Sequence, residues 1–148
     1  MARPTYETAA DLDAEAKVAA QLARAWEAEP LKLPKFYKCD WALSREGAVK
    51  VFLEIKCRRN TPSKYPTVII SADKYAYLKQ LDAALGIPAL LVFKFSDGSV
   101  YYVRPAACDP FPVAVGGRHD RNDPEDTEPV VHIPVGSLTI AYGPVSKA

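Results

Sequence analysis

The 148-residue sequence has few residues of the kinds that bind zinc and no long hydrophobic run. Its three cysteines show no C-x-x-C spacing, and its two histidines, His119 and His132, stand apart from any acidic or cysteine partner. A disulfide framework, a zinc site and a Ser-His-Asp triad are therefore not predicted. The apolar run 87–92 is too short to span a bilayer, and the first residues lack a signal-peptide core. We expect no membrane partner and a cytoplasmic location, the host cytoplasm if the protein is viral.

The sequence also lacks an excess of basic or acidic residues, since its net charge is +1. Hydrophobic residues make up 49% and charged residues 25%, as in ordinary globular proteins, and the length predicts a single domain over 1–148. So small a net charge does not indicate a nucleic-acid binder. Residues 45–64, however, hold six basic against two acidic residues. This cluster is either a solvated face or a phosphate-binding surface, and the candidate nucleic-acid contacts in it are Arg45, Arg58, Arg59 and Lys64.

The pattern of apolar residues, caps and turns predicts two helices and a series of strands. The first helix is expected over 9–29, with Thr8 as its N-cap and Pro30 as its stop, and the second follows Ser71 to about Leu85, with Gly86 at its exit. Strands are expected at 35–43 and 49–57, joined as an antiparallel hairpin, at 67–70, and as a second hairpin at 87–95 and 100–104. The order is α-β-β-β-α-β-β, which predicts an α/β (α+β) fold with helices covering a central sheet.

The remaining residues are expected to contribute a β-rich extension. Residues 105–128 are rich in Pro, Gly and Asp, so they predict an irregular surface loop, including a flexible segment at 116–120. Residues 130–134 and 137–142 predict a closing pair of strands. The core is thus expected to end near residue 104.

Two charged residues lie on one face of an otherwise apolar predicted strand, 49–57. Because side chains alternate, Glu54 and Lys56 share one face and the odd-numbered apolar residues share the other. The hairpin would bring Asp40 beside Glu54 if the registers match. Two neighbouring carboxylates without Cys or His favour Mg²⁺ or Mn²⁺, which would supply positive charge at a phosphodiester while Lys56 supplies more. The alternative is a structural ion pair of Glu54 and Lys56 on a solvated sheet face.

Asp40, fourteen positions before Glu54, followed by Glu54-Ile55-Lys56, resembles the motif of the PD-(D/E)XK nucleases. Cys39 stands where that motif has proline. The resemblance covers about 11–104 and includes the α-β-β-β-α-β order, so it implies a restriction-endonuclease-like αβββαβ core with a central mixed sheet. It also implies that Asp40, Glu54 and the carbonyl of Ile55 bind Mg²⁺, with Mn²⁺ as a possible substitute, and that Lys56 is catalytic.

Two further residues are candidates for the same site. Glu15 falls inside the apolar stripe of the first helix, and similar nucleases carry a glutamate there that reaches the metal directly or through water. Glu7 and Asp11 are weaker candidates. Lys74 lies among apolar residues in the first turn of the second helix, where a cation opposes the helix dipole unless it serves an anion. The alternatives are a Glu15 that reaches solvent at the margin of the stripe and a Lys74 that extends to solvent.

Three functions are compatible with these residues. The first is a Mg²⁺-dependent endonuclease that hydrolyses DNA, with selectivity for branched DNA and a homodimer as one form that the resemblance suggests. The second is a nucleic-acid-binding or assembly module that keeps the nuclease fold without catalysis. The third is a small-molecule or protein-binding domain in which the acidic and basic residues simply pair.

Overall fold

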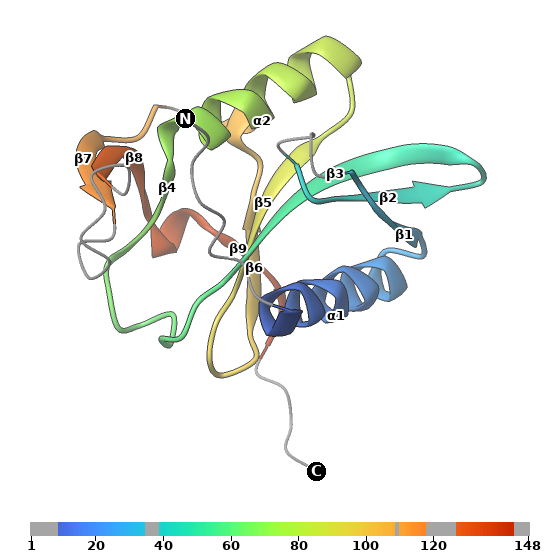
Figure 1. Cartoon of the computed structure of the whole chain (residues 1–148), viewed down its shortest axis with the longest axis horizontal. Helices are drawn as coiled ribbons and strands as arrows, with labels where there is room; N and C mark the ends of the chain where they lie inside the picture. Colours follow the sequence, from blue (N-terminus) through green and yellow to red (C-terminus); the bar gives the residue numbers. More distant parts are fainter. Residues whose placement is uncertain (1–8, 35–38, 109, 118–126, 144–148) are drawn as a thin grey trace.

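The computed structural model describes residues 9–34, 39–108, 110–117 and 127–143, and it contains two α-helices and two β-sheets (Figure 1). The elements of the first half are α1 (Ala9–Ala25), β1 (Glu29–Lys32), β2 (Trp41–Arg45), β3 (Ala48–Cys57) and β4 (Thr67–Ser71). Those of the second half are α2 (Ala72–Leu85), β5 (Ala89–Lys94), β6 (Val100–Val103), η1 (Pro105–Ala107), β7 (Val113–Gly117), β8 (Thr127–Pro134), η3 (Val135–Ser137) and β9 (Thr139–Tyr142).

The central sheet has six strands in the order β1-β2-β3-β5-β6-β9. Strands β3 and β5 are parallel, and the other neighbours are antiparallel, so the sheet is mixed. A second, antiparallel sheet has three strands in the order β4-β8-β7. The predicted α/β class with a central mixed sheet is confirmed.

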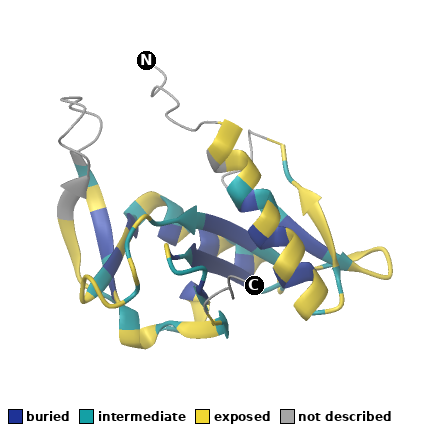
Figure 2. Cartoon of the chain, turned by 90° about the horizontal axis from the view of Figure 1, so that it is seen from below, coloured by how far each residue is buried: buried dark blue, intermediate teal, exposed yellow. Residues whose placement is uncertain are grey.

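The central sheet lies between two apolar layers (Figure 1, Figure 2). On one face α1 packs on β2 and β3 through Val18, Leu22, Leu43, Leu53 and Ile55, all fully buried. The other face is covered by α2 and the small sheet. Burial on both faces explains why β5 is apolar along almost its whole length, as expected of an inner strand next to a parallel neighbour.

The first helix ends at Ala25, four residues earlier than predicted, and Pro30 is not its stop. Glu27 adopts a left-handed conformation with φ 53°, and the amide of Ala28 donates to the carbonyl of Ala23 at 2.7 Å. This is the hydrogen-bond pattern of a Schellman cap, which commonly has glycine at the left-handed position. Pro30 instead lies in β1, where a missing amide is tolerated because β1 is an edge strand.

Strand β1 was not predicted, and it changes which strands form the core. The order α-β-β-β-α-β is present, but in the central sheet its first three strands are β1, β2 and β3, and its last is β5. The predicted third strand, at 67–70, is β4 of the small sheet. Four strands therefore lie between the two helices where three were predicted: β1 was missed, and the predicted third strand belongs to the small sheet.

The second helix was predicted correctly at both ends. The Ser71 hydroxyl accepts a hydrogen bond from the amide of Lys74 at 3.3 Å, as an N-cap does. Gly86, with φ 65°, takes the left-handed position after the last turn and donates to the carbonyl of Asp82. These caps set where α2 begins, and so they place Lys74 in its first turn.

The segment after residue 104 is more regular than predicted. It contains η1 and strand β7, which includes Gly116 and Gly117, so the predicted irregular loop is wrong over these elements; residues 118–126 lie outside the described part. Strand β8 begins at Thr127, three residues before its predicted start. The last two strands do not pair with each other: β8 pairs with β4 and β7, and β9 pairs with β6 at the edge of the central sheet. The core therefore does not end at residue 104.

An ion pair joins the C-terminal half of α2 to the central sheet. The buried carboxylate of Asp82 accepts two hydrogen bonds from Arg104, at 2.8 and 2.9 Å, and a third from the amide of Ala89 at 3.0 Å. The hydrogen bonds from Arg104, more than that from Ala89, hold the pKa of Asp82 below its usual value. The pair thus holds the end of α2 against the start of β5 and the end of β6.

We expect Asp82→Asn to lower the free energy of unfolding at pH 7 by about 1–3 kcal/mol, because the charged acceptor is lost. A depressed folded-state pKa contributes stability that is present above the unfolded-state pKa and is lost as the pH falls through the folded-state value. The difference between wild type and variant should therefore be constant above about pH 5 and shrink below about pH 4. Urea unfolding at pH 7, 5 and 3.5 measures it, and a difference that grows at acid pH would contradict this account.

Candidate nuclease site

The β2–β3 hairpin brings Asp40 and Glu54 together. Trp41 pairs with Leu53 and Ala42 with Phe52, so the next pair along the same register is Asp40 and Glu54. Directly opposite residues on antiparallel strands have side chains on the same face, about 5 Å apart at Cβ. The predicted proximity of the two carboxylates is confirmed, and the charge of Glu54 acts on Asp40.

Glu54 is fully buried and shares one of its oxygens with two lysines. Its Oε1 lies 2.6 Å from the Nζ of Lys74 and 3.2 Å from the Nζ of Lys56. Its Oε2 is also buried, and within the described residues it has no hydrogen-bond partner. Only one of the two carboxylate oxygens of Glu54 therefore has partners. A buried carboxylate oxygen without a partner is energetically costly.

Asp40 is half-buried and holds its proton more tightly than an ordinary aspartate. Burial, followed by the charge of Glu54, raises the pKa of Asp40 to about 6, and the charges of Lys74, Lys56 and Lys32 act in the opposite direction. Like charges close together raise the pKa of a carboxyl in this way. With a pKa of about 6, Asp40 is largely ionised at neutral pH, and a bound cation would favour the ionised form further.

Lys74 reaches the site from α2, on the face of the sheet opposite α1. Burial acts to lower the pKa of Lys74, but the charge and hydrogen bond of Glu54 outweigh it, so the pKa is raised. The anion that Lys74 contacts in the structure is Glu54, and a role of Lys74 at the scissile phosphate stays a prediction. The ammonium is about one third exposed, so it is not cut off from solvent.

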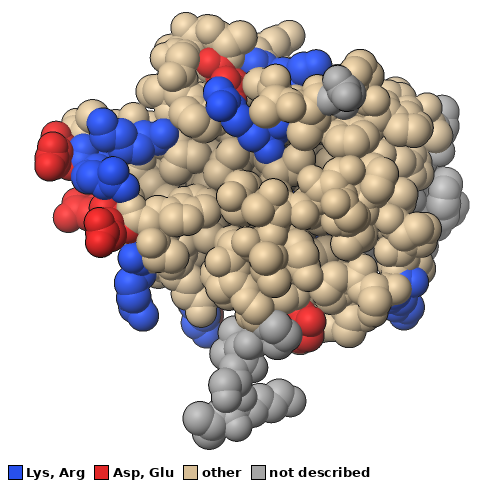
Figure 3. Space-filling view, turned by 180° about the vertical axis from the view of Figure 1, so that it is seen from behind, with Lys and Arg blue, Asp and Glu red and all other residues tan. Residues whose placement is uncertain are grey.

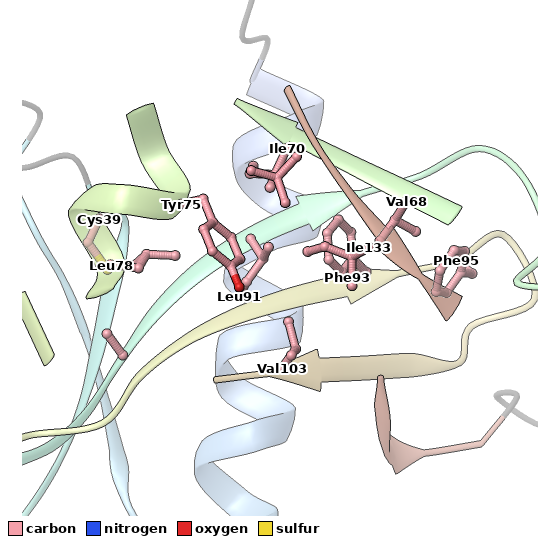
Figure 4. Close-up of a cluster of buried hydrophobic side chains, with 12 residues drawn as sticks. Cys39, Val68, Ile70, Tyr75, Leu78, Leu91, Phe93, Phe95, Val103 and Ile133 are labelled. Atoms are coloured by element: carbon pink, nitrogen blue, oxygen red, sulfur yellow. The ribbon is translucent and has the colours of Figure 1, made fainter. Parts of the chain in front are cut away.

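Cys39 occupies the position of the motif's proline and is a packing residue. Its side chain is 1% exposed and belongs to the apolar cluster under α2, where Figure 4 shows it with Leu78. Its thiol donates to the carbonyl of Leu53 at 3.1 Å. Burial, with the charge of Glu54 next, raises the pKa of Cys39 to about 12, so the thiol stays protonated and helps hold β2 against β3.

The donor atoms fit one hard divalent cation held by two protein carboxylates. Asp40 and Glu54 supply oxygen ligands, and the unpartnered Oε2 of Glu54 is available. Ile55 is fully buried in the α1 layer, so it could contribute only its carbonyl. Within the described ranges no three His, Cys, Asp or Glu residues lie close enough to hold one ion, so water and substrate would complete the coordination.

Glu15 is buried at 7% exposed, so the alternative of a side chain that reaches solvent is wrong. It belongs to α1, which covers the face of the sheet opposite α2, and it does not form a three-carboxylate group with Asp40 and Glu54. Its action on the metal through water stays a prediction. Glu7 and the side chain of Asp11 lie outside the described part of the chain.

The four predicted nucleic-acid contacts lie in different surroundings. Arg45 is at the far end of the hairpin, where its guanidinium donates to the carbonyls of Trp26 and Glu27, at 2.9 Å to the latter. Arg58 donates to the carbonyl of Ile69 at 2.8 Å and stacks on Phe93, and burial lowers its pKa. Arg59 and Lys64 are exposed on the loop after β3. A role of all four in binding DNA stays a prediction, and the two exposed residues are its better candidates.

Lys32 was missed by the sequence patterns, although it lies beside Asp40. Its Nζ donates to the carbonyl of Asp40 at 3.2 Å. The strand that carries it has only four residues, too short for a periodic signal. The face seen in Figure 3 is largely uncharged at its centre, with both basic and acidic side chains toward its margins.

Helices on both faces of this mixed sheet, with Asp40 directly before one strand and Glu54-Ile55-Lys56 on the next, are the features of the PD-(D/E)XK nuclease class. The sequence profile of the family described as "Phage putative PDDEXK endonuclease" matches residues 1–141. The chain belongs to this family. No curated protein matches the chain.

A solved structure with a similar fold is that of Archaeoglobus fulgidus Hjc, a Holliday junction resolvase from an archaeal hyperthermophile. The superposition has a TM-score of 0.52 at 15% sequence identity and covers 66% of this chain and 75% of that one. At this identity the likeness shows the fold alone. Neither described helix is long and apolar enough to cross a membrane.

We expect Lys74→Met to destabilise the fold by roughly 2–4 kcal/mol, because Glu54 then keeps only the more distant Lys56 as an ion-pair partner. Lys74→Arg should lose less than half as much, since it keeps the charge. Lys79→Met, at an exposed position of the same helix, is the matched control and should change stability by less than about 0.5 kcal/mol. Equal losses for the two methionine variants in urea unfolding would show that the ion pair does not support the fold.

Proposed function

We propose that this protein is a divalent-metal-dependent endonuclease that hydrolyses phosphodiester bonds of DNA, with Mg²⁺ as its ion and Mn²⁺ as a substitute. The observation that carries the proposal is the half-satisfied carboxylate of Glu54. Two lysines share its Oε1, its Oε2 is buried without a hydrogen bond, and Asp40 lies opposite. A purely structural ion pair would not need a second carboxylate beside it, and the pKa of Asp40 is raised by burial and then by the charge of Glu54.

Each residue of the site has a proposed role that follows from its position. Asp40, Glu54 and the carbonyl of Ile55 would hold the cation, which supplies Lewis-acid charge at the scissile phosphate. Lys56, 27% exposed and beside Glu54, is placed to orient the attacking water or to stabilise charge on the phosphate oxygens. Lys74 pairs with the Oε1 of Glu54 from α2 and would hold this carboxylate in position. Glu15 would act on the ion through water.

DNA is the proposed substrate, and branched DNA the preferred form. The family is one of endonucleases, and the structural relative Hjc is a Holliday junction resolvase. Recognition of DNA shape, and not a long sequence readout, is part of the proposal. A homodimer is part of the proposal, because cutting both strands of a branched substrate in one encounter requires two sites. Arg59 and Lys64 would contact the backbone.

We expect the purified protein to cleave DNA with Mg²⁺ or Mn²⁺ and not with EDTA, and to cleave a four-way junction faster than linear duplex or single-stranded DNA. Asp40→Asn and Lys56→Ala should each lower the single-turnover rate at least about 100-fold, because each removes a charged group placed at the scissile phosphate. Gel assays with end-labelled substrates measure the rates.

Lys79→Ala, at an exposed position of α2, is the control and should cleave as wild type does. Cleavage that persists at the wild-type rate in Lys56→Ala would point to a contaminating nuclease. Absence of cleavage by wild type on all three substrates with both metals, with binding to DNA retained, would favour the non-catalytic module.

Metal binding can be measured without activity. If Asp40 and Glu54 hold the ion, Mn²⁺ at ten times its dissociation constant should add about 1.4 kcal/mol of stability, which raises the melting temperature by a few degrees. Asp40→Asn should abolish the shift. Differential scanning fluorimetry with a Mn²⁺ titration measures it.

Asp13→Asn is the matched control, since Asp13 is an exposed aspartate on α1 that pairs only with Lys17. It should keep the full shift. The same rise in Asp40→Asn, or no rise in wild type up to millimolar Mn²⁺, would refute the two-carboxylate site and favour the structural ion pair.

A further inference from the structure

Lys32 is fixed at the rim of the proposed site by its strand. It is the last residue of β1 and pairs with Trp41, the residue after Asp40. The amide of Leu33 donates to the carbonyl of Asp40 at 2.9 Å, so the ladder continues one step past the strand. The position of Lys32 relative to Asp40 is therefore set by backbone hydrogen bonds and not by a loop.

The ammonium of Lys32 is held but not neutralised. Its Nζ donates to the carbonyls of Asp40 and Leu33, at 3.2 and 3.4 Å, and lies 5.7 Å from the centre of the Trp41 ring. These partners carry no formal charge, and no carboxylate of the described residues forms an ion pair with it. Lys56 and Lys74, in contrast, both lie against Glu54. Of the three cations, Lys32 is the one without a carboxylate in close contact, and its charge acts on Asp40 only at longer range, so it is available for an external anion besides the one that Lys56 serves.

The charge balance of the cluster points in the same direction. Three ammonium groups, of Lys32, Lys56 and Lys74, face two carboxylates, which leaves one uncompensated positive charge. Lys32 is exposed, so this charge lies at the surface. Contact with an aromatic ring and two carbonyls reduces the rotamer freedom that a long side chain loses on binding.

We infer that Lys32 binds a backbone phosphate that neighbours the scissile one. The inference rests on the proposed function and adds a substrate contact to it. Paired residues share a face, so the side chains of Lys32 and Trp41 start from the α1 face of the hairpin, where Trp41 packs, whereas Asp40 starts from the other. Lys32 therefore reaches the site from its edge, and it contacts a flanking phosphate while Lys56 serves the scissile one.

The test is the salt dependence of DNA binding by Lys32→Ala. Equilibrium binding to a fluorescent four-way junction is measured in EDTA and in Ca²⁺ at 0.05 to 0.3 M salt. Loss of one phosphate contact should lower the magnitude of the slope of log K against log salt by about 0.9 and weaken binding about eightfold at 0.1 M salt. Lys32→Arg keeps the charge, so it should keep the wild-type salt slope and bind with an affinity within about twofold of wild type.

Lys79→Ala removes one positive charge elsewhere on the surface and is the matched control. It should leave the slope unchanged, which separates a contact from an effect of net charge. Thermal unfolding checks that Lys32→Ala is folded, and Lys32→Gln, which keeps most of the side chain, repeats the measurement. If Lys32→Ala and Lys32→Gln show the same slope and affinity as Lys79→Ala, the inference is wrong.

The same proteins separate this inference from the proposed function. Cleavage by wild type with an unchanged salt slope in Lys32→Ala would overturn the contact and keep the nuclease. A reduced slope in Lys32→Ala, with no cleavage by wild type in either metal, would keep the contact and overturn the catalytic proposal. In an active enzyme the substitution should raise KM more than it lowers kcat, because the contact is made before the transition state. Failure of wild type to bind any DNA would overturn both.

Discussion

The structure depends on a negative charge that is completely buried. Glu54 has no exposed surface, and a carboxylate in such a place is strongly unfavourable unless cations compensate for it. Lys56 comes from the same strand and Lys74 from the first turn of α2. This requirement ties the start of α2 to the centre of the sheet, and it leaves Oε2 without a partner at the point where Asp40 arrives from β2.

Other contacts hold the framework around that charge. The Schellman cap after α1 turns the chain sharply enough for β1 to line the edge of β2. The thiol of Cys39 holds β2 to β3 beside Asp40, and the Asp82–Arg104 pair holds the opposite end of α2. Elements that pack on both faces of one sheet thus place the two carboxylates and the three lysines of the site. This is the arrangement that the proposed phosphodiester chemistry needs.

Local patterns predicted the parts of the site that obey a simple period. Alternation along β3 placed Glu54 and Lys56 on one face, the hairpin register placed Asp40 opposite, and helical spacing marked Lys74 and the buried Glu15. The errors have a different cause. The end of α1 was wrong because Glu27 takes a left-handed conformation that glycine usually provides. Strands β4 and β8 were placed wrongly because their partners are distant in sequence.

By itself the sequence determined the two helices, the strands from β2 to β6, the caps of α2 and the charged residues of the motif, because each depends on neighbours within a few positions. Only the tertiary structure decided that β1 is a strand of the central sheet, that β9 joins its edge, and that Lys32 lies beside Asp40. A four-residue strand has no periodic signal of its own and is stabilised by the partner that it pairs with. The pairing of β1 with β2 therefore decided the outer part of the site.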